Sequence, residues 1–209
     1  MSVDPERLTV MLAQGTEHAW RATGARQFAW RVREPTIDPA WYLGTLQAMH
    51  PVYQVLEQRL ASAPTDPRLA PISLLSLART PALEADLDFF GVTPGRPGPS
   101  SLRYVAHLHK LAAWSPRLLV AHAWVRSLCL LEDAAALRDC VRAAFGLTTA
   151  KGTALFDFGG LDLVTWREGY DALPLARADR EMLVAEAVYA LELGAALSPA
   201  AVSRLTLAA

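Results

Sequence analysis

Cysteine and lysine are scarce in this chain. Only two cysteines, Cys129 and Cys140, occur among its 209 residues. Both fall in one predicted helix, about 16 Å apart at 1.5 Å of rise per residue, so they cannot form a disulfide with each other. A reducing cytoplasmic compartment is the simplest expectation. Lys110 and Lys151 are the only lysines among 20 basic residues, so arginine supplies nearly every cation available for binding an anion.

Long apolar runs and broad fields of one charge are also missing. No window is long and apolar enough to span a bilayer, so a membrane partner is not expected. The stretch MSVDPERLTV at the start has no basic region followed by an apolar run, and it therefore predicts no secretory signal. The formal net charge is −1, without the basic field that a nucleic-acid partner requires.

The composition and the apolar periodicity indicate an all-α protein with one domain over residues 1–209. A hydrophobic fraction of 52% in 209 residues suits a single sizeable core. An N-capping residue followed by Pro marks five helix starts, at residues 4, 38, 80, 115 and 198. No alternating strand pattern competes with these signals. The predicted helices cover 5–23, 25–32, 39–63, 69–78, 81–91, 102–114, 116–146 and 178–196, with a short one after Ser198.

The longest predicted helix, 116–146, is apolar around most of its circumference. Such a helix is expected to run through the middle of a bundle. Its inner face is predicted to combine apolar residues with two charges, Arg126 and Asp133. A buried charge needs a partner, a ligand or water. The residues that repeat along this face are Leu119, Ala123, Arg126, Leu130, Asp133 and Leu137.

Segments spread over nearly the whole chain resemble the heme oxygenase family. YQVLEQRL resembles the Tyr and Leu-Glu signature of the family's second helix, and LARTPALEADLDFF resembles its Arg/Lys-x-x-x-Leu-Glu-x-Asp-Leu segment. SLRYVAHLHKL followed by SPRLLVAHAWVRSL is similar to the RYV-x-x-LH and LL-x-AH-x-Y-x-RYL pattern. ALFDFGGLDLVTWREGY and VAEAVYALEL match the last two family segments in order and spacing.

This resemblance implies a helical fold that holds heme between a proximal first helix and a distal central helix. Members of the family open the ring with dioxygen and electrons, which gives biliverdin, carbon monoxide and iron. A neutral imidazole must hold the iron. The distal backbone must approach the ring closely, which glycine permits, and an acidic side chain must organise the water that delivers a proton.

The first helix departs from the family at the iron ligand. The first helix of the family carries a Thr and, four residues later, the His that binds iron. Here Thr16 is followed, four residues later, by Trp20. An indole nitrogen is only a donor and cannot coordinate iron. His18 is nearby but points about 200° away on a helix, so an exposed or partly packed His18 is expected. A rotated first helix that brings His18 to the iron is the alternative.

The central helix departs from the family at its glycines. Arg126, Leu128 and Leu131 match the pattern Arg-Tyr-Leu-Gly-Asp-Leu-Ser-Gly-Gly, but its three glycines and its Asp are replaced. Each glycine replaced in the helix interior should stabilise the helix by about 0.5–1 kcal/mol and make it more regular. The added side chains should also leave less room for a ring. The replacements are Cys129, Asp133 and Ala134 for the glycines, and Leu130 for the Asp.

Some polar positions of the family persist and others are lost. Tyr53 and Arg126 match members of the distal polar network, although Arg126 could equally be held by Asp133 or Glu132. Among the basic positions that contact the propionates, Arg167 matches one, while a second falls on Asp171. Trp124 stands at the Tyr of the AH-x-Y motif. The resemblance therefore implies remodelled pocket positions at Trp20, Trp124, Cys129, Leu130, Asp133, Ala134 and Arg167.

Two other kinds of metal site are compatible with parts of the sequence: a thiolate-ligated heme and a di-iron centre. Cys129 could ligate heme iron as a thiolate, although a buried structural thiol is the simpler interpretation. The same fold hosts di-iron oxidases, but Glu57, Glu84 and Glu186 lie in segments that heme oxygenases share and are interpreted as structural. The Asp-x-x-x-His that a di-iron site needs is absent. His109 and His122, which with His107 belong to the family motif, fit surface or capping roles better than ligation.

Three hypotheses follow from the sequence. The leading one is a divergent member of the family that has lost ordinary heme degradation and acts by binding, either a hydrophobic ligand in the remodelled pocket or a protein partner. The second is a heme oxygenase that still opens heme through a rearranged axial ligand, either His18 or Cys129. The third is a helical oxidase with another cofactor.

Overall fold

The computed structural model describes residues 6–23, 27–34, 36–62 and 78–198, and these residues contain helices and no strand. The predicted helix at 69–78 and the one after Ser198 lie outside the described residues. The α-helices are α1 (Leu8–Ala22), α2 (Gln27–Val32), α3 (Pro39–Ala61), α5 (Thr80–Phe89), α6 (Pro99–Trp114), α7 (Leu119–Leu131), α8 (Ala134–Ala144), α9 (Leu163–Asp171) and α10 (Arg177–Ala195), with short 3-10 turns η1 (Pro116–Leu118) and η2 (Ala154–Phe156).

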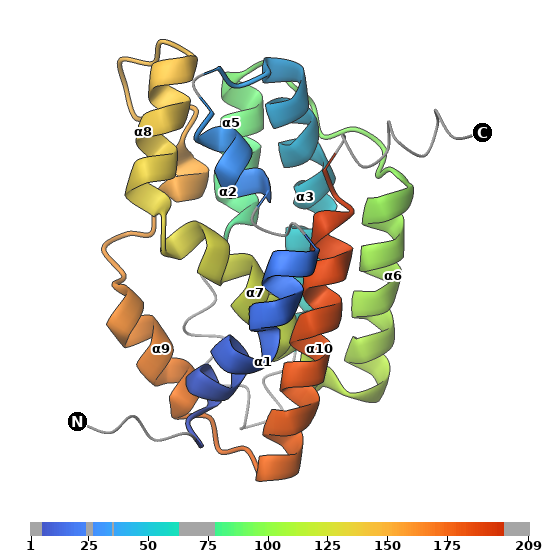
Figure 1. Cartoon of the computed structure of the whole chain (residues 1–209). Helices are drawn as coiled ribbons and strands as arrows, with labels where there is room; N and C mark the ends of the chain where they lie inside the picture. The colour runs from blue at the N-terminus through green and yellow to red at the C-terminus, as the bar shows by residue number, and fades with distance from the viewer. Residues whose placement is uncertain (1–5, 24–26, 35, 63–77, 199–209) are drawn as a thin grey trace.

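The described residues form helices and no strand, which confirms the all-α assignment, and these helices bury apolar stripes. Leu8, Leu12 and Thr16 of α1 are all inside, and so is the stripe of α3 that begins at Tyr42 and ends at Leu56. The helices α1 and α10 pack side by side, and α3 packs against both α5 and α6 (Figure 1). At Gly15 the approach of α1 to α10 is so close that a Cβ atom would collide with Val184.

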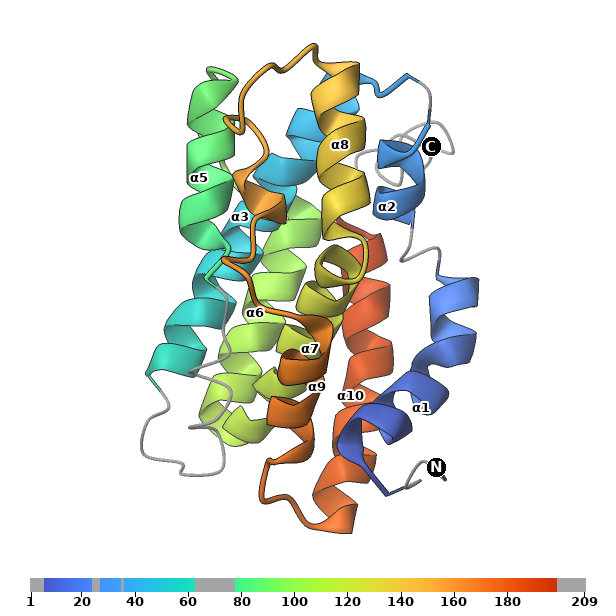
Figure 2. The ribbon, with the colours of Figure 1, turned by 90° about the vertical axis from the view of Figure 1, so that its left-hand side faces the viewer.

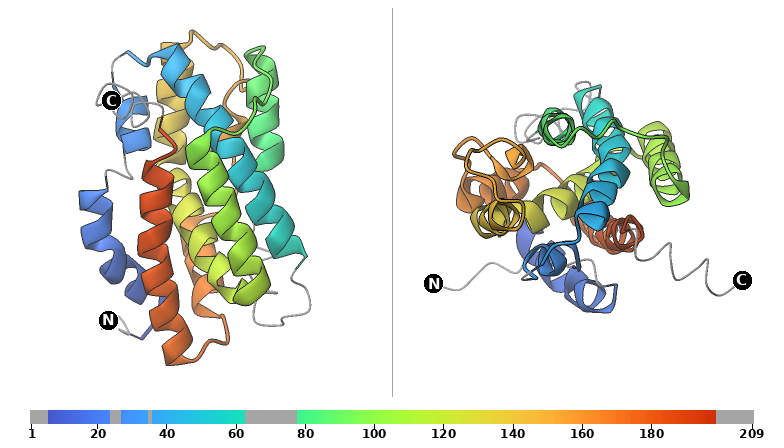
Figure 3. Two further views of the ribbon diagram at one scale, coloured as in Figure 1. Left: turned by 90° about the vertical axis from the view of Figure 1, so that its right-hand side faces the viewer. Right: turned by 90° about the horizontal axis from the view of Figure 1, so that it is seen from above.

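The helix α7 lies at the centre of the molecule, as predicted. Every residue from Leu119 to Val125 is buried, so this part of the helix has no wet face. It packs against α10, α3 and α6, and the view from above shows it inside the other helices (Figure 3). None of the described helices is long and apolar enough to cross a membrane.

The prediction of one continuous helix over 116–146 is wrong. A 3-10 turn forms over Pro116–Leu118, and the helix then stops after Leu131 and restarts at Ala134. Asp133 between them has φ −118° and ψ 8°, outside the helical range, and its carboxylate is paired with Arg33 at 2.5 Å. Replacing the family's glycines has therefore not made this helix regular. The reason is that α8 packs on α2 and η2, beyond the end of α7 (Figure 2).

Helix starts follow the predicted capping pattern only in part. Asp38 accepts a hydrogen bond from the Ala40 backbone N–H at 2.9 Å and caps α3 as expected. At α5 the predicted cap Thr80 is the first helical residue instead, and the Glu57 carboxylate, from α3, accepts hydrogen bonds from the N–H groups of Arg79 and Thr80. A carboxylate at a helix N-terminus is favourable because it satisfies free N–H groups and the helix dipole. The structural interpretation of Glu57 is consistent with this contact.

Candidate functional site

A cleft of about 650 Å³ opens between α1 and α7. Its volume is in the range of small-molecule sites, which is roughly 300–1,000 Å³. The first helix forms one wall, the cleft-facing side of α7 forms the other, and α9 closes the rim. The lining residues are Thr9, Val10, Ala13, Gln14, Glu17, Trp20, Arg21, Trp30, Trp124, Leu128, Glu132 and Arg167.

Trp20 occupies the wall of this cleft on α1. The helix brings it there because Thr16, one turn earlier, points inward and donates its hydroxyl to the Leu12 carbonyl at 2.6 Å. The Trp20 indole is 9% exposed, so most of its surface is packed and its remainder faces the cleft. A large flat side chain therefore stands where a shorter imidazole would leave space.

His18 lies on the other side of α1. It is exposed and does not line the cleft, as expected from its offset of two residues from Trp20. The alternative of a rotated first helix finds no support in this geometry, because Thr16 and Trp20 keep the buried register while His18 faces solvent.

Trp124 forms the opposite wall and is held rigidly from behind. Its ring stacks on Trp166 of α9 with centroids 4.5 Å apart, and Tyr170 packs against both rings. Only 1% of Trp124 is exposed. Its indole Nε1 is buried and has no acceptor among the residues that the structure describes. An unsatisfied buried donor is unusual and costs about 1–3 kcal/mol.

The charges at the rim of the cleft are paired with one another. Arg167 of α9 donates to Glu132 at 3.0 Å, and Arg21 pairs with Glu17 one turn earlier on α1. The two cations and two carboxylates cancel, so the cleft carries no net charge from these four residues. The rim therefore provides no preformed cationic clamp for a ligand with two carboxylates.

Asp171, at the family's second basic position, has acquired a structural contact. One carboxylate oxygen accepts the Thr9 backbone N–H at 2.9 Å, and the other accepts the Thr9 hydroxyl at 3.0 Å and the Arg7 Nε at 2.8 Å. This carboxylate comes from α9 and satisfies the first turn of α1. An Asp at this position thus provides no cation, and it anchors the N-terminal end of α1, which forms one wall of the cleft.

Arg126 is buried, but its predicted partners are held elsewhere. Glu132 pairs with Arg167, and Asp133 pairs with Arg33. Each of the two carboxylates thus has another arginine partner, and the pairing of Arg126 with either of them stays a prediction. The break after Leu131 places Asp133 outside the regular helical register of α7.

The surroundings of Arg126 lie on the side of α7 away from the cleft. Its guanidinium lies against Gly194 of α10, where an added Cβ atom would collide with it. The Tyr53 hydroxyl donates to the Arg126 backbone carbonyl at 3.0 Å. The two family-position residues, Tyr53 and Arg126, are therefore in contact, but neither lines the cleft.

The remaining predicted pocket positions are divided by the helix geometry. Leu130 is buried, yet it does not line the cleft, because it lies two positions after Leu128 and therefore on another side of the helix. Asp133 and Ala134 lie at the helix break and also do not line it. Cys129 belongs to α7 by its backbone, but its side chain lies outside the described part of the chain.

Sequence reasoning missed several lining residues. Trp30 of α2 is 61% exposed and reaches the cleft from a helix that the sequence did not connect with it. Leu128 and Glu132 extend the line of Trp124 at four-residue spacing, a signal that was present in the sequence. The same spacing links Ala13, Glu17 and Arg21 on α1.

The glutamates considered for a di-iron site are dispersed. Glu57 caps α5, and Glu84 contacts His50 at 3.0 Å. Glu186 instead meets two imidazoles, which makes His107, His122 and Glu186 the one group of three close metal-ligating side chains found among the described residues. The di-iron arrangement is therefore not assembled in this part of the chain.

His122 was expected to have a surface or capping role, and this expectation is wrong. Its side chain is 0% exposed, because it projects from α7 into the contact with α6 and α10. Burial lowers the pKa of His122 below its ordinary value, although the Glu186 carboxylate opposes that effect. His109 is at the surface as expected, with its Nδ1 2.9 Å from the Arg59 guanidinium.

The fold and the cleft define a class of protein: a helical bundle with a cleft between its first and central helices. The heme oxygenase family model matches residues 6–198. The chain therefore belongs to the heme oxygenase family.

Relatives with that description align over most of the chain. The heme oxygenase of Pyropia yezoensis is 29% identical over 160 residues, covering 72% of this chain and 67% of the relative. That of Rhodella violacea is 26% identical over 195 residues, covering 89% and 83%.

Solved structures agree with the same assignment. Heme oxygenase from Leptospira interrogans superposes with a TM-score of 0.83 at 26% identity, covering 91% of this chain and 98% of that one. Heme oxygenase-1 from the cyanobacterium Synechocystis, solved in complex with heme, superposes with a TM-score of 0.82 at 25% identity, covering 97% and 95%.

The described lining residues do not fit heme as an iron-coordinating cofactor. Heme iron in proteins is held by His, Cys, Met or Tyr, and none of these types is among the described side chains that line the cleft. Trp20, which the sequence comparison places at the family's axial position, offers only an N–H donor. The described lining therefore supplies no protein ligand to an iron centre.

Proposed function

We propose that this protein binds a flat, largely apolar, ring-shaped ligand of tetrapyrrole size in the cleft, without coordinating iron and without ordinary heme degradation. The observation that carries the proposal is Trp20 in the wall of the cleft, at the position of the family's axial His. An indole in that place offers a face for stacking where an imidazole would offer a metal ligand.

The walls suit a ring that is held by its faces. Trp20, Trp30 and Trp124 come from three different helices and all line the cleft. Burying an aromatic side chain against a ring contributes area and a further gain of about 0.5–1.5 kcal/mol for each well-placed pair. Trp124 is 1% exposed and stacked on Trp166, so it forms a rigid backing for the wall, whereas Trp30, at 61% exposed, offers most of the accessible aromatic surface.

The rim favours a ligand with few charges. Arg21 and Arg167 are each engaged by a glutamate, so a ligand carboxylate would have to displace Glu17 or Glu132. Exposed ion pairs of this kind contribute only about 0–1 kcal/mol. Replacing a glutamate with a ligand carboxylate therefore costs little free energy, but it also adds little net affinity. We therefore expect stacking, more than charge, to determine affinity.

Ordinary heme degradation also needs an acidic side chain beside the bound oxygen. The absence of an acid at Leu130 supports the same proposal. Leu130 replaces the family's Asp there and is buried away from the lining side of α7. A hydrocarbon side chain can neither donate a proton nor order the water that does.

Comparing hemin with iron-free protoporphyrin IX tests the proposal directly. Quenching of tryptophan fluorescence gives an affinity for each ring. Because stacking does not need the metal, the two affinities should agree within about threefold, which corresponds to well under 1 kcal/mol. The bound hemin should show no sharp Soret band that His18→Ala changes, and ascorbate should produce no biliverdin spectrum.

Trp20→His is the matched variant, since it restores the imidazole at the family's axial position. It should strengthen hemin binding, sharpen the Soret band and leave protoporphyrin IX binding weaker or unchanged. Conversion of hemin to biliverdin by the unaltered protein would overturn the proposal in favour of an active enzyme with a rearranged ligand. Loss of the Soret band in Cys129→Ala, but not in His18→Ala, would identify that ligand as Cys129.

A further inference from the structure

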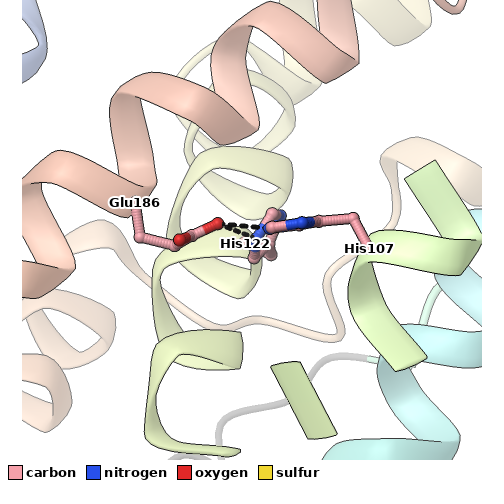
Figure 4. Close-up of side chains that lie close together, drawn as sticks. All are labelled: His107, His122 and Glu186. Atoms are coloured by element: carbon pink, nitrogen blue, oxygen red, sulfur yellow. Dashed lines mark hydrogen bonds and ion pairs between the residues drawn. The ribbon is translucent and has the colours of Figure 1, made fainter. Parts of the chain in front are cut away.

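Three side chains of types that can ligate a metal come together from three helices on the side of α7 opposite the cleft, which is called the rear side below. His107 comes from α6, His122 from α7 and Glu186 from α10 (Figure 4). The Glu186 Oε1 atom lies 2.6 Å from His107 Nε2 and 2.9 Å from His122 Nε2. All three ligand atoms lie within 4.8 Å of one another, so one small ion can reach them together.

We propose that His107, His122 and Glu186 form a binding site for one divalent transition-metal ion, with zinc as the best match. Two imidazole nitrogens and one carboxylate oxygen form a common protein set for tetrahedral zinc, and they leave a fourth position for water. Bond lengths of about 2.0–2.2 Å to such an ion require only small outward movements of these side chains.

The environment of His122 prepares its Nε2 for an ion. Its other nitrogen, Nδ1, lies 2.9 Å from the Tyr104 hydroxyl. If Nδ1 carries the proton and donates it to Tyr104, Nε2 presents a lone pair toward Glu186. Metal-ligating imidazoles are usually oriented in this way by a partner on the second nitrogen. Complete burial of His122 then fixes its ring, so its entropy loss on binding is small.

The other two ligands provide access. The side chains of His107 and Glu186 are 19% and 14% exposed, whereas His122 is 0% exposed. An ion and its water can therefore enter from the side of α6 and α10. The His107 ring is held at that entrance by an edge contact with Tyr189, with centroids 4.8 Å apart.

The charge of the cluster favours a cation. Glu186 supplies one negative charge, and neutral imidazoles add none. Arg126 exerts an opposing positive field on His122. Direct bonds to three ligands at about 2 Å act at much shorter range than this field, and zinc affinity depends mainly on such bonds. The arginine should therefore weaken the site without preventing binding.

The proposed site is separate from the cleft. His122 and Trp124 are two residues apart on α7, about 200° around the helix axis, so they project to opposite sides. A bound ion would join α6, α7 and α10 and would stabilise the native chain by an amount that rises with the logarithm of the ion concentration above Kd. The inference does not depend on the ligand proposed for the cleft, and its tests use zinc alone.

Zinc titration of the full chain after chelator treatment tests the site. Competition with a colour-forming chelator gives the affinity, and elemental analysis after gel filtration gives the stoichiometry. One zinc per chain and a rise in Tm on adding zinc are expected. Tyr104→Phe should weaken binding by about tenfold, the lower end of the effect of losing an outer partner. His107→Ala and Glu186→Gln should weaken it further.

His109→Ala is the matched control, because this exposed histidine lies two residues after His107 on the same helix and contacts Arg59. It should leave zinc affinity unchanged. Equal zinc binding by His107→Ala would overturn the proposal, since the ion would then be held elsewhere, at a cysteine for example. Absence of stoichiometric zinc in the unaltered protein would also overturn it. His107→Ala is the primary variant because its partial exposure makes a folded product expected.

Discussion

The two sides of α7 differ in the kind of chemistry they offer. On the cleft side, Trp124, Leu128 and Glu132 face an open volume of about 650 Å³. On the rear side, His122 is enclosed with Glu186 and His107 in a polar cluster. The group of three close potential metal ligands among the described residues therefore lies on the side of α7 opposite the cleft.

This contrast shows how a family frame can persist while its chemical groups change. The cleft is preserved because α1 and α7 still pack around α10, and that packing depends on apolar stripes. The chemistry of the cleft depends on single side chains, such as Trp20, which the sequence comparison places at the family's axial His. Folds are robust to such substitutions, whereas sites are not.

Truncating the cleft wall should have the largest effect on stability. Trp124→Ala is expected to cost about 3–5 kcal/mol, because it leaves a cavity behind Trp166 and Tyr170. Trp124→Phe keeps most of the stacking and removes the indole donor that lacks an acceptor, so it should cost much less. Urea unfolding of both variants measures the difference. Equal losses would show that the donor, not the ring, matters.

Breaking the rear cluster should have the next largest effect. In the presence of a chelator, Glu186→Ala removes the carboxylate that both imidazoles contact and should cost about 1–3 kcal/mol. Glu192→Ala, at an exposed position on the same helix, should stay within about 0.5 kcal/mol. Chemical denaturation compares them. If the two variants lose the same stability, the cluster is not a distinct energetic unit.

The anchor of the first helix should have an intermediate effect that is confined to the cleft side. Asp171→Ala removes the acceptor for the Thr9 N–H and hydroxyl and should cost about 1 kcal/mol, as for other helix caps. Asp171→Asn keeps one oxygen for Thr9 and should lose less. Amide exchange in the first turn of α1 should rise in the Ala variant. Exchange that increases equally around His122 would contradict the separation of the two sides.

The smallest effect is expected at the break between α7 and α8. Arg33 and Asp133 are both more than a third exposed, so their ion pair should contribute about 0–1 kcal/mol in a double-mutant cycle. We therefore expect the break to persist in Arg33→Ala, with little change in helix content by circular dichroism. A marked gain in helix content would mean that this ion pair, and not packing of α8, maintains the break.

Much of the fold could be predicted from the sequence, because local periodicity and capping carry most of that information. The positions of most helices followed from capping signals and spacing, and the burial of α7 followed from its apolar circumference. The break at Asp133 could not be predicted, since an apolar period of 3.6 continues across it. It exists because α8 finds its partners on α2 and η2, and such contacts are not encoded in neighbouring residues.

The candidate site shows the same division at the level of single residues. Trp20, Trp124 and Arg167 were identified from the family pattern and do line the cleft. Leu130, Asp133 and Ala134 were identified in the same way and do not line it. His122 was misplaced at the surface, because a lone histidine in an apolar helix gives no local sign of its partners.

The sequence by itself determined which faces of the helices are apolar and which family the chain resembles, and it predicted Trp20 and Leu130 at the family's axial and proton-organising positions. Only the tertiary structure decided which charges meet. Glu186 is 64 residues from His122 and 79 from His107, and Arg167 is 35 residues from Glu132. Such pairs depend on how helices cross and on which rotamers fit between them, and helical periodicity fixes neither.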